Sequence, residues 1–324
     1  MISRVSFFLY LLLVFNSCDA PVMPLPGVTG KAGELVVVMD QNLWKGASGD
    51  TVFNTLTQHV YGLPQPEPMF NVVHIRTDAF TKIFQTHRNI VVANIGDGFQ
   101  KRIDLKTDVW ANPQVVVEIS APTIAEFNDI FGHNADRIIG HVLNMEQSRI
   151  LKSYKAQLNQ GVALALEEQF GISLTIPNGY DIVASNEDFA WVRHEDKEII
   201  QSVLVYSVPY EKENTFSKEG MIEVMNQFAK ANVPGPDEGT YMTTYLEYPP
   251  QLVESSISGK YASRLVGLWN VEGALMGGPF VSYAMLDASG KRVIYLHGFV
   301  FAPSKDKRNY LRQVDAILNS AVLR

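Results

Sequence analysis

Cys18 is the only cysteine in the 324-residue chain, and it directly follows a short apolar segment. An arginine precedes that segment, which spans residues 5–15, and small residues lie just before the cysteine. This order is typical of a bacterial secretion signal whose cysteine thiol is acylated after cleavage. We therefore predict a signal peptide over residues 1–17 and lipidation of Cys18. The alternative is a plain signal peptide with an incidental cysteine, since Phe15 and Asn16 depart from the commonest pattern.

The predicted lipidation determines where the protein would reside. One acyl chain anchors a protein only marginally, so stable attachment would require several chains, such as palmitate, on Cys18. The apolar segment is well short of the roughly 20 residues that a membrane-spanning helix needs, and no later run reaches that length. Because no acidic or lysine-rich cluster follows Cys18, we expect attachment to the outer membrane of the cell envelope, facing the periplasm.

Residues suited to acid–base or nucleophilic chemistry are scattered along the chain. Gly-x-Ser-x-Gly, Ser-x-x-Lys and His-Glu-x-x-His strings are absent, as are glycine-rich phosphate loops. His133 and His141 would lie about 12 Å apart on a helix, too far to share one zinc ion. His297 is predicted to be a hydrogen-bonded, half-buried strand residue on the same face as Tyr295 and Phe299. We predict no catalytic residue, no metal site and no cofactor.

An envelope hydrolase with an unrecognised active site is the alternative function. It would require a cleft in which His297, or another histidine, meets a carboxylate or a serine within hydrogen-bond reach.

The string from Gly267 to Tyr283 (GLWNVEGALMGGPFVSY) is the most distinctive in the chain. Its consecutive glycines allow backbone shapes that other residues resist, and large apolar side chains beside a glycine turn can line a pocket. The candidate binding residues are Trp269, Met276, Gly277, Gly278 and Pro279. A tight connection whose tryptophan fills the core is the competing interpretation.

Charge limits the classes of partner. Cleavage after residue 17 removes one arginine, so the mature chain would carry 26 basic and 34 acidic residues, a net charge of −8 with neutral histidines. This balance argues against nucleic-acid binding, which needs clustered basic residues. Lys305, Lys307, Arg308 and Arg312 do cluster at the start of the last predicted helix. They could meet an acidic partner or lipid headgroups, but we favour a solvated helix face.

Around these residues the chain divides into recognisable segments. Residues 18–33 are rich in proline and glycine and predict a tether. Residues 34–170 alternate short β-branched runs, at 35–39, 71–75, 90–95 and 115–119, with amphipathic helices. Thr123 and Glu126 form a capping box that predicts a helix start.

A long helix from about residue 136 to 170, possibly broken near Gly161 and ended by Gly171, would connect the two halves. Within the first half, Leu63 to Pro68 contains three prolines and predicts a rigid extended connector. Residues 171–324 contain many strand-like runs and two helices, the first of which starts at Ser217.

These patterns predict an α/β (α+β) protein with two domains. The N-terminal domain, residues 34–170, would be a mixed sheet covered by helices, because continuous apolar strands such as LVVVM indicate burial on both faces. The C-terminal domain, residues 171–324, would be an antiparallel sheet flanked by helices.

Several strings resemble those of the DUF4837 family, uncharacterised lipoproteins found mainly in Bacteroidetes. They are GELVVVMD, LPQPEPMF, RNIVVANI, GLWNVEGALMGGPFVSY and GFVFAPSKDKRNYLRQVDAIL. The resemblance implies a lipid-anchored envelope protein without known catalytic residues. The C-terminal half, which opens with ISLTIPNGYDIV, more loosely resembles the Mog1/PsbP-like α/β/α sandwich, whose members mostly act as binding or assembly modules.

Together these observations predict a non-catalytic module that binds a protein partner or ligand in the cell envelope, is held on a membrane by its lipidated N-terminus, and does not bind nucleic acid.

Overall fold

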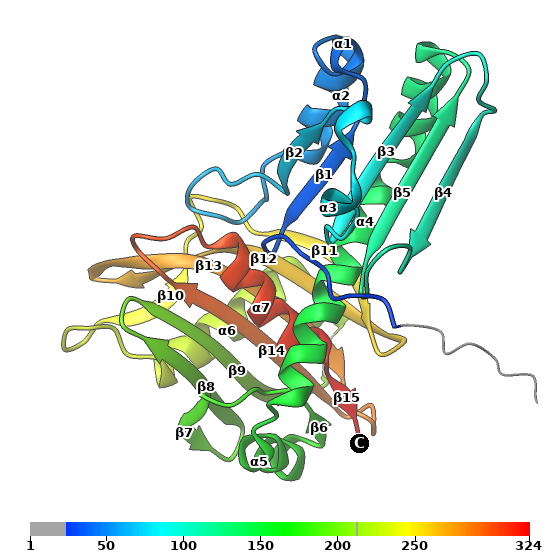
Figure 1. Ribbon diagram of the computed structural model, residues 1–324. Coiled ribbons are helices and arrows are strands. Elements are labelled where there is room, and N and C mark those ends of the chain that lie inside the picture. The colour runs from blue at the N-terminus through cyan, green and yellow to red at the C-terminus, as the bar shows by residue number, and fades with distance from the viewer. Residues whose placement is uncertain (1–23, 212) are drawn as a thin grey trace, which may run out of the picture.

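The structure is a computed structural model, which describes residues 24–211 and 213–324. The predicted signal peptide and Cys18 lie outside these described residues. Figure 1 shows two sheets, each with its own helices, joined by one long helix that runs between them. The predicted α+β fold is confirmed. None of the helices in the described part of the chain is long and apolar enough to cross a membrane.

The N-terminal sheet is built from apolar strands that are mostly parallel. Its order is β2-β1-β3-β5-β4, and only β4 runs antiparallel to its neighbour. The strands are β1 (Glu34–Val38), β2 (Asn71–Ile75), β3 (Asn89–Ile95), β4 (Arg102–Thr107) and β5 (Val115–Ala121). Four of them match predicted runs. Sequence analysis missed β4 because its residues, RIDLKT, are half-exposed at the sheet edge and mix polar with apolar side chains.

Helices and loops cover both faces of this sheet, as the continuous apolar strands predict. The helical elements are α1 (Gln41–Trp44), α2 (Ala47–Leu56), η1 (Thr77–Ala79), α3 (Lys82–Gln85) and α4 (Ile124–Ala156). On one face, Leu56 of α2 and Phe127 of α4 pack against Leu35, Val37 and Val117. On the other face, the partly buried side chains of Phe80 and Trp110 pack over the buried Val36, Val38 and Ile90.

The long connecting helix α4 joins the helix predicted to open at Thr123 with the long helix predicted from about residue 136. It begins after Thr123, whose hydroxyl accepts a hydrogen bond from the Glu126 amide at 3.2 Å, so the predicted helix start is confirmed. Its 33 residues end at Ala156, and α5 (Gln160–Phe170) follows. A break is predicted near Gly161, and the break lies at residues 157–159, where the Asn159 side chain caps α5. Gly171 ends α5 at φ 66°.

The C-terminal sheet is antiparallel and lies between helices on both faces. Its order is β10-β12-β13-β14-β9-β8-β7, with β11 also paired to β12. The strands are β7 (Asp181–Asn186), β8 (Phe189–Asp196), β9 (Ile199–Pro209), β10 (Tyr241–Thr244), β11 (Gln251–Ile257), β12 (Lys260–Glu272), β13 (Ala274–Leu286) and β14 (Arg292–Phe301). A separate pair joins β6 (Ile172–Ser173) to β15 (Val322–Leu323).

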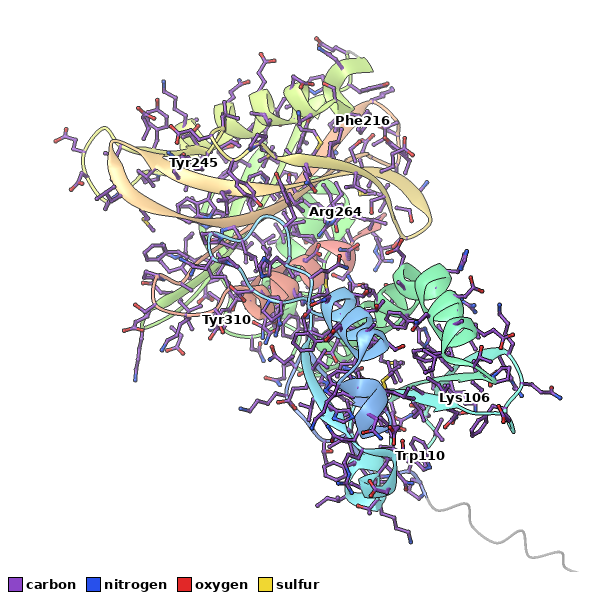
Figure 2. The ribbon with its side chains drawn as sticks, turned by 90° about the horizontal axis from the view of Figure 1, so that it is seen from above. Lys106, Trp110, Phe216, Tyr245, Arg264 and Tyr310 are labelled. Atoms are coloured by element: carbon purple, nitrogen blue, oxygen red, sulfur yellow. The ribbon has the colours of Figure 1, made fainter. Side chains whose placement is uncertain are left out.

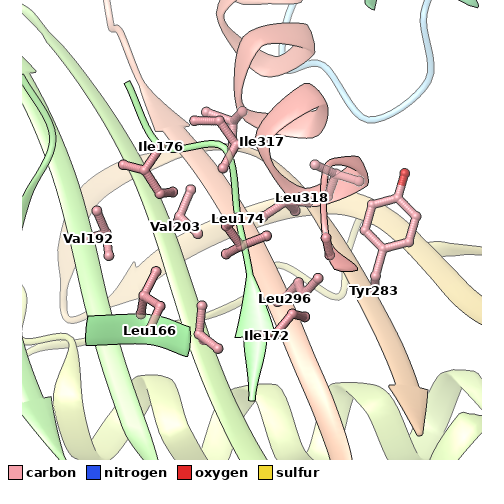
Figure 3. Close-up of a cluster of buried hydrophobic side chains, with 14 of the residues drawn as sticks. Leu166, Ile172, Leu174, Ile176, Val192, Val203, Tyr283, Leu296, Ile317 and Leu318 are labelled. Carbon is pink, nitrogen blue, oxygen red and sulfur yellow. The ribbon is translucent and has the colours of Figure 1, made fainter. Parts of the chain in front are cut away.

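The two faces of this sheet carry separate apolar clusters. Helices α5 and α7 (Arg308–Asn319) pack on one face. There, Figure 3 shows Leu166, Ile317 and Leu318 around the sheet, with Tyr283 at the edge of the cluster and its hydroxyl directed away from the apolar side chains. The opposite face is covered by α6 (Lys218–Asn232), which follows the short η2 (Glu213–Phe216).

Two segments differ from their predicted form. Gly277, Gly278 and Pro279 are not a turn; they lie inside β13, and the hairpin turn falls at Gly273, φ 85°. The last part of the segment predicted as a tether, residues 18–33, is packed on the folded body. The Thr29 amide donates to the Thr86 carbonyl at 2.9 Å, and the Pro26 carbonyl accepts from Asn112 at 2.9 Å, so residues 26–33 lie against the N-terminal sheet.

Candidate functional site

An apolar pocket of about 200 Å³ lies at one end of the C-terminal sheet, on the face covered by α6. Aromatic and methionine side chains from five strands contribute to its lining: Trp191, Met242, Trp269, Met276, Phe299 and Phe301. These residues come from β8, β10, β12, β13 and β14. Because side chains of a strand alternate between faces, the antiparallel register brings them together on this face.

Trp269 is held in a fixed orientation by its neighbours. Its side chain is 3% exposed, and its indole Nε1 donates to the Val300 carbonyl at 3.3 Å. Its ring meets Phe299 edge-on, with centroids 5.2 Å apart. A Cβ at Gly278 would lie 2.1 Å from the Val300 oxygen and 3.1 Å from the indole Nε1. The glycine therefore permits both the close strand approach and the tryptophan position.

One wall of the pocket is a short proline-rich loop. Residues 233–236, Val-Pro-Gly-Pro, line the pocket after α6 ends. The Gly235 amide donates to the Thr240 carbonyl at 2.9 Å, and the Met242 amide donates to the Val233 carbonyl at 3.0 Å. A Cβ at Gly235 would lie 2.5 Å from Val271. The pocket is therefore preformed by a tightly packed wall.

Arg193 provides the positive charge at this pocket. Its guanidinium lies 5.4 Å from the centre of the Trp191 ring and 3.2 Å from the Glu195 carboxylate. Its side chain is 34% exposed, so the charge is accessible to solvent. The pocket thus offers an apolar interior and one cation beside it.

The structure brings two of the predicted binding residues into this pocket. Trp269 and Met276 line it, whereas Gly277, Gly278 and Pro279 do not. Sequence analysis missed Trp191, Arg193 and the Phe299–Phe301 pair. The available signal was their spacing: Trp191 and Arg193, like Phe299 and Phe301, are two residues apart on a strand, and such side chains lie on the same face of the sheet.

His297 differs from its predicted state. It is 3% exposed rather than half-buried, and its Nδ1 has no hydrogen-bond partner in the part of the chain that the structure describes. Its ring lies 5.2 Å from Phe280 and 5.9 Å from Phe299. Burial lowers the pKa of His297 to about 3, so this histidine is neutral at pH 7.

The other histidine contacts do not assemble a catalytic pair with a nucleophile. His87 Nε2 lies 3.3 Å from Glu34, and His133 Nδ1 lies 3.1 Å from Asp129. Over residues 24–211 and 213–324, no hydrogen bond joins a histidine to a serine. The same residues contain no group of three or more histidine, cysteine, aspartate or glutamate side chains placed to hold a metal ion.

The basic cluster at the start of α7 is not a solvated helix face. Lys307 and Arg308 are 3% and 5% exposed, and only Lys305 is exposed as predicted. The carboxylate of Glu67, in the proline-rich connector, accepts hydrogen bonds from the backbone amides of Lys307 at 2.6 Å and Arg308 at 2.9 Å. The prediction was wrong because the N-terminal half supplies this carboxylate, which suits a positive helix N-terminus.

Comparison with known families matches both halves of the chain. A model described as "Domain of unknown function (DUF4837)" matches residues 159–320. The chain belongs to the DUF4837 family. A second model, "Domain of unknown function (DUF8532)", matches residues 28–155. In this DUF4837 protein the two matches meet where α4 gives way to α5. No curated protein matches the chain.

Two solved structures resemble parts of the DUF4837 protein loosely. One is LpqN, "involved in cell envelope biogenesis of Mycobacterium tuberculosis", which is 12% identical, covers 47% of this chain and 82% of its own, and has a TM-score of 0.30. The other is the human StarD13 (DLC2) lipid transfer and protein localization domain, which is 15% identical, covers 50% of this chain and 94% of its own, and has a TM-score of 0.23.

Proposed function

We propose that this DUF4837 protein is a lipid-anchored binding module of the cell envelope, facing the periplasm from the outer membrane. In this proposal the aromatic pocket receives one apolar side chain of a protein partner, and the acylated Cys18 holds the module on the membrane. The single observation that carries the proposal is the preformed pocket of about 200 Å³ lined by Trp191, Trp269 and Phe299.

The size of the pocket favours an anchoring side chain over a whole small molecule. Pockets for drug-sized ligands measure about 300–1,000 Å³, whereas a cavity of about 150 Å³ holds a benzene ring. A volume of about 200 Å³ therefore suits one aromatic or large aliphatic side chain.

The composition of the pocket supports the same occupant. Tryptophan and arginine are enriched among the residues that carry most binding energy at protein interfaces, and such residues line pockets that anchor the partner. Arg193 beside Trp191 would pair with an acidic residue next to the anchor. Charge complementarity of this kind sets specificity and association rate more than affinity.

Pocket filling tests the binding role. Met276→Trp would place a bulky ring in the pocket, and Leu275→Trp is the matched control because Leu275 is fully exposed one residue away. We would crosslink native membranes and compare the proteins recovered with each variant. The proposal expects a partner that is retained by wild type and Leu275→Trp and reduced at least ten-fold by Met276→Trp. Recovery of the same proteins with all three chains would refute it.

The anchor is tested separately by Cys18→Ala. Lipidation predicts that wild type fractionates with membranes and that Cys18→Ala is released into the soluble fraction. A Cys18→Ala chain that stays with the membrane would show that the thiol is not the anchor, whatever the outcome of the pocket experiment.

A further inference from the structure

A second and larger concavity, of about 440 Å³, lies where the two halves of the protein meet. Helix α4 forms one wall, and α7 and the edge strand β11 form the others. It shares no lining residue with the aromatic pocket. Arg264, labelled in Figure 2, projects into this groove from β12. The volume falls in the range of small-molecule sites.

Three arginines line this groove. Arg264 is paired with Asp315, whereas the guanidinium groups of Arg308 and Arg312 have no carboxylate partner among the described residues. The Nη2 of Arg312 donates to the Met69 carbonyl at 2.8 Å and contacts the Met69 sulfur at 3.4 Å. Its Nη1 is buried and has no hydrogen-bond partner among the described residues. Burial and the nearby Arg308 lower the pKa of Arg312 to about 10, so it still carries its charge at pH 7. A buried donor of a charged group left unpaired is costly.

The carboxylates that line the groove are already paired. Asp315 accepts from Arg264 at 3.1 Å and from the Tyr283 hydroxyl at 2.8 Å. Glu146 accepts from Arg88 at 2.8 Å and forms an ion pair with Arg149. These pairs leave no lining carboxylate free for Arg312, so the groove holds a surplus of positive charge.

The walls around Arg312 combine apolar and polar side chains. The apolar part comes from Leu143 and Ile150 of α4, Val253 of β11, and Val266 and Leu311, and polar side chains such as Gln147 and Gln251 lie among them. A ligand that joins a negative group to a largely apolar body suits this lining.

We propose that this groove binds a small organic anion, with its carboxylate or phosphate on Arg312 and its apolar body between α4 and β11. A guanidinium forms strong charge-assisted hydrogen bonds with carboxylate and phosphate groups, and Nη1 of Arg312 is the unpaired donor for such a bond. Because α4 belongs to the first half and β11 and α7 to the second, the bound anion contacts both halves. This site goes beyond the proposed function and is independent of the aromatic pocket.

Calorimetric titration of the full chain with hexanoate, hexyl phosphate and uncharged hexanol tests the site. We expect at least one of the two anions to bind at least ten-fold more tightly than hexanol, and the stronger of them to identify the anionic group. Arg312→Gln is expected to lower the affinity for that anion at least ten-fold. Arg312→Lys keeps the charge and is expected to lower the affinity less. Lys305→Gln lies outside the groove and is expected to leave the affinity unchanged. The proposal would be overturned if hexanol bound as tightly as both anions, or if Arg312→Gln bound the anion as tightly as wild type.

A second variant keeps the test valid if Arg312→Gln folds poorly. Val253 lines the groove and is 50% exposed, so Val253→Trp fills the space while every arginine of the groove is kept. Leu252→Trp is its matched control, because adjacent strand residues point to opposite faces. We expect Val253→Trp alone to reduce anion binding at least ten-fold while its melting temperature stays at the wild-type value. Equal anion binding by the two variants would also refute the site.

Discussion

The Glu67 carboxylate caps the helix that starts at Arg308, 241 residues further along the chain, by accepting its backbone amide at 2.9 Å. Glu67 is 5% exposed and also accepts from the Lys307 amide. One buried side chain of the N-terminal half thus supplies the charge that the last helix of the C-terminal half requires. This contact ties the two halves together through the backbone of α7.

Glu67→Gln is expected to destabilise the protein by about 1–3 kcal/mol, because it removes the charge at the cap and leaves one amide facing an NH2 group. Urea unfolding measures this loss. Gln65→Ala is a useful control, since Gln65 lies in the same connector and accepts a hydrogen bond from the Lys307 side chain rather than from a backbone amide of α7. A Glu67→Gln loss no larger than that of Gln65→Ala would show that the cap contributes little.

Glu146→Gln is expected to cost about 3–5 kcal/mol, because it leaves Arg88 and Arg149 without their buried counter-charge. Glu195→Gln breaks an exposed pair with Arg193 and should cost less than about 1 kcal/mol. The two losses are compared from the denaturant midpoints of the variants, provided that their free energies of unfolding depend equally steeply on denaturant concentration. Similar losses for both would contradict the buried role of Glu146.

Gly278→Ala is expected to destabilise the C-terminal half by about 2–3 kcal/mol, since the added methyl would overlap the Val300 carbonyl. The same change at Gly98, where a Cβ meets no atom within 4 Å, is the control. Tryptophan fluorescence checks the local effect, because the methyl also displaces the Trp269 indole. An unshifted emission maximum together with wild-type stability would disprove this account of Gly278.

His297 predicts a loss of stability in acid. Burial lowers its pKa from 6.5 to about 3, so between these values the unfolded chain binds a proton that the folded chain does not. Stability therefore falls as the pH drops below about 6.5, by about 1.4 kcal/mol per unit from this residue. Burial, and then the Arg137 charge, also lower the pKa of His141, which adds a smaller effect of the same sign.

The variant His297→Phe removes the larger of these two contributions. Its stability relative to wild type should rise by about 2 kcal/mol between pH 7 and pH 5. Unfolding curves in urea at both pH values make the comparison, with His59→Phe as an exposed control. A relative stability that does not change with pH would contradict the buried neutral state.

Local sequence signals predicted much of the fold. The run LVVVM became β1 because an uninterrupted apolar strand needs cover on both faces. Thr123, Ser217 and Gly171 marked helix ends through side-chain caps and a left-handed residue. The strands β4 and β7 were missed because edge strands with mixed, half-exposed residues carry no clear period.

The candidate sites were less accessible to sequence analysis, because they depend on register and on contacts between the halves. Trp269 stood out as a large side chain in a glycine-rich string, but Trp191 and Phe299 join it only through the pairing of β8, β9 and β14. Likewise, Glu67 is one carboxylate among prolines, and nothing local indicates that it meets Arg308. Unless the contact with Glu67 is known, the basic residues at the start of α7 look like an ordinary solvent-exposed helix face.

The central pairing of the C-terminal sheet has a consequence for how this protein folds during synthesis. Strand β9 pairs along its length with β14, joining Arg292 to Pro209 and Phe301 to Ile200. Contacts between such distant residues carry a large loop-closure cost and slow folding. During synthesis, the edge of β9 that pairs with β14 stays open until residue 301 has left the ribosome, whereas its other edge can already pair with β8. This open edge is where a chaperone would act.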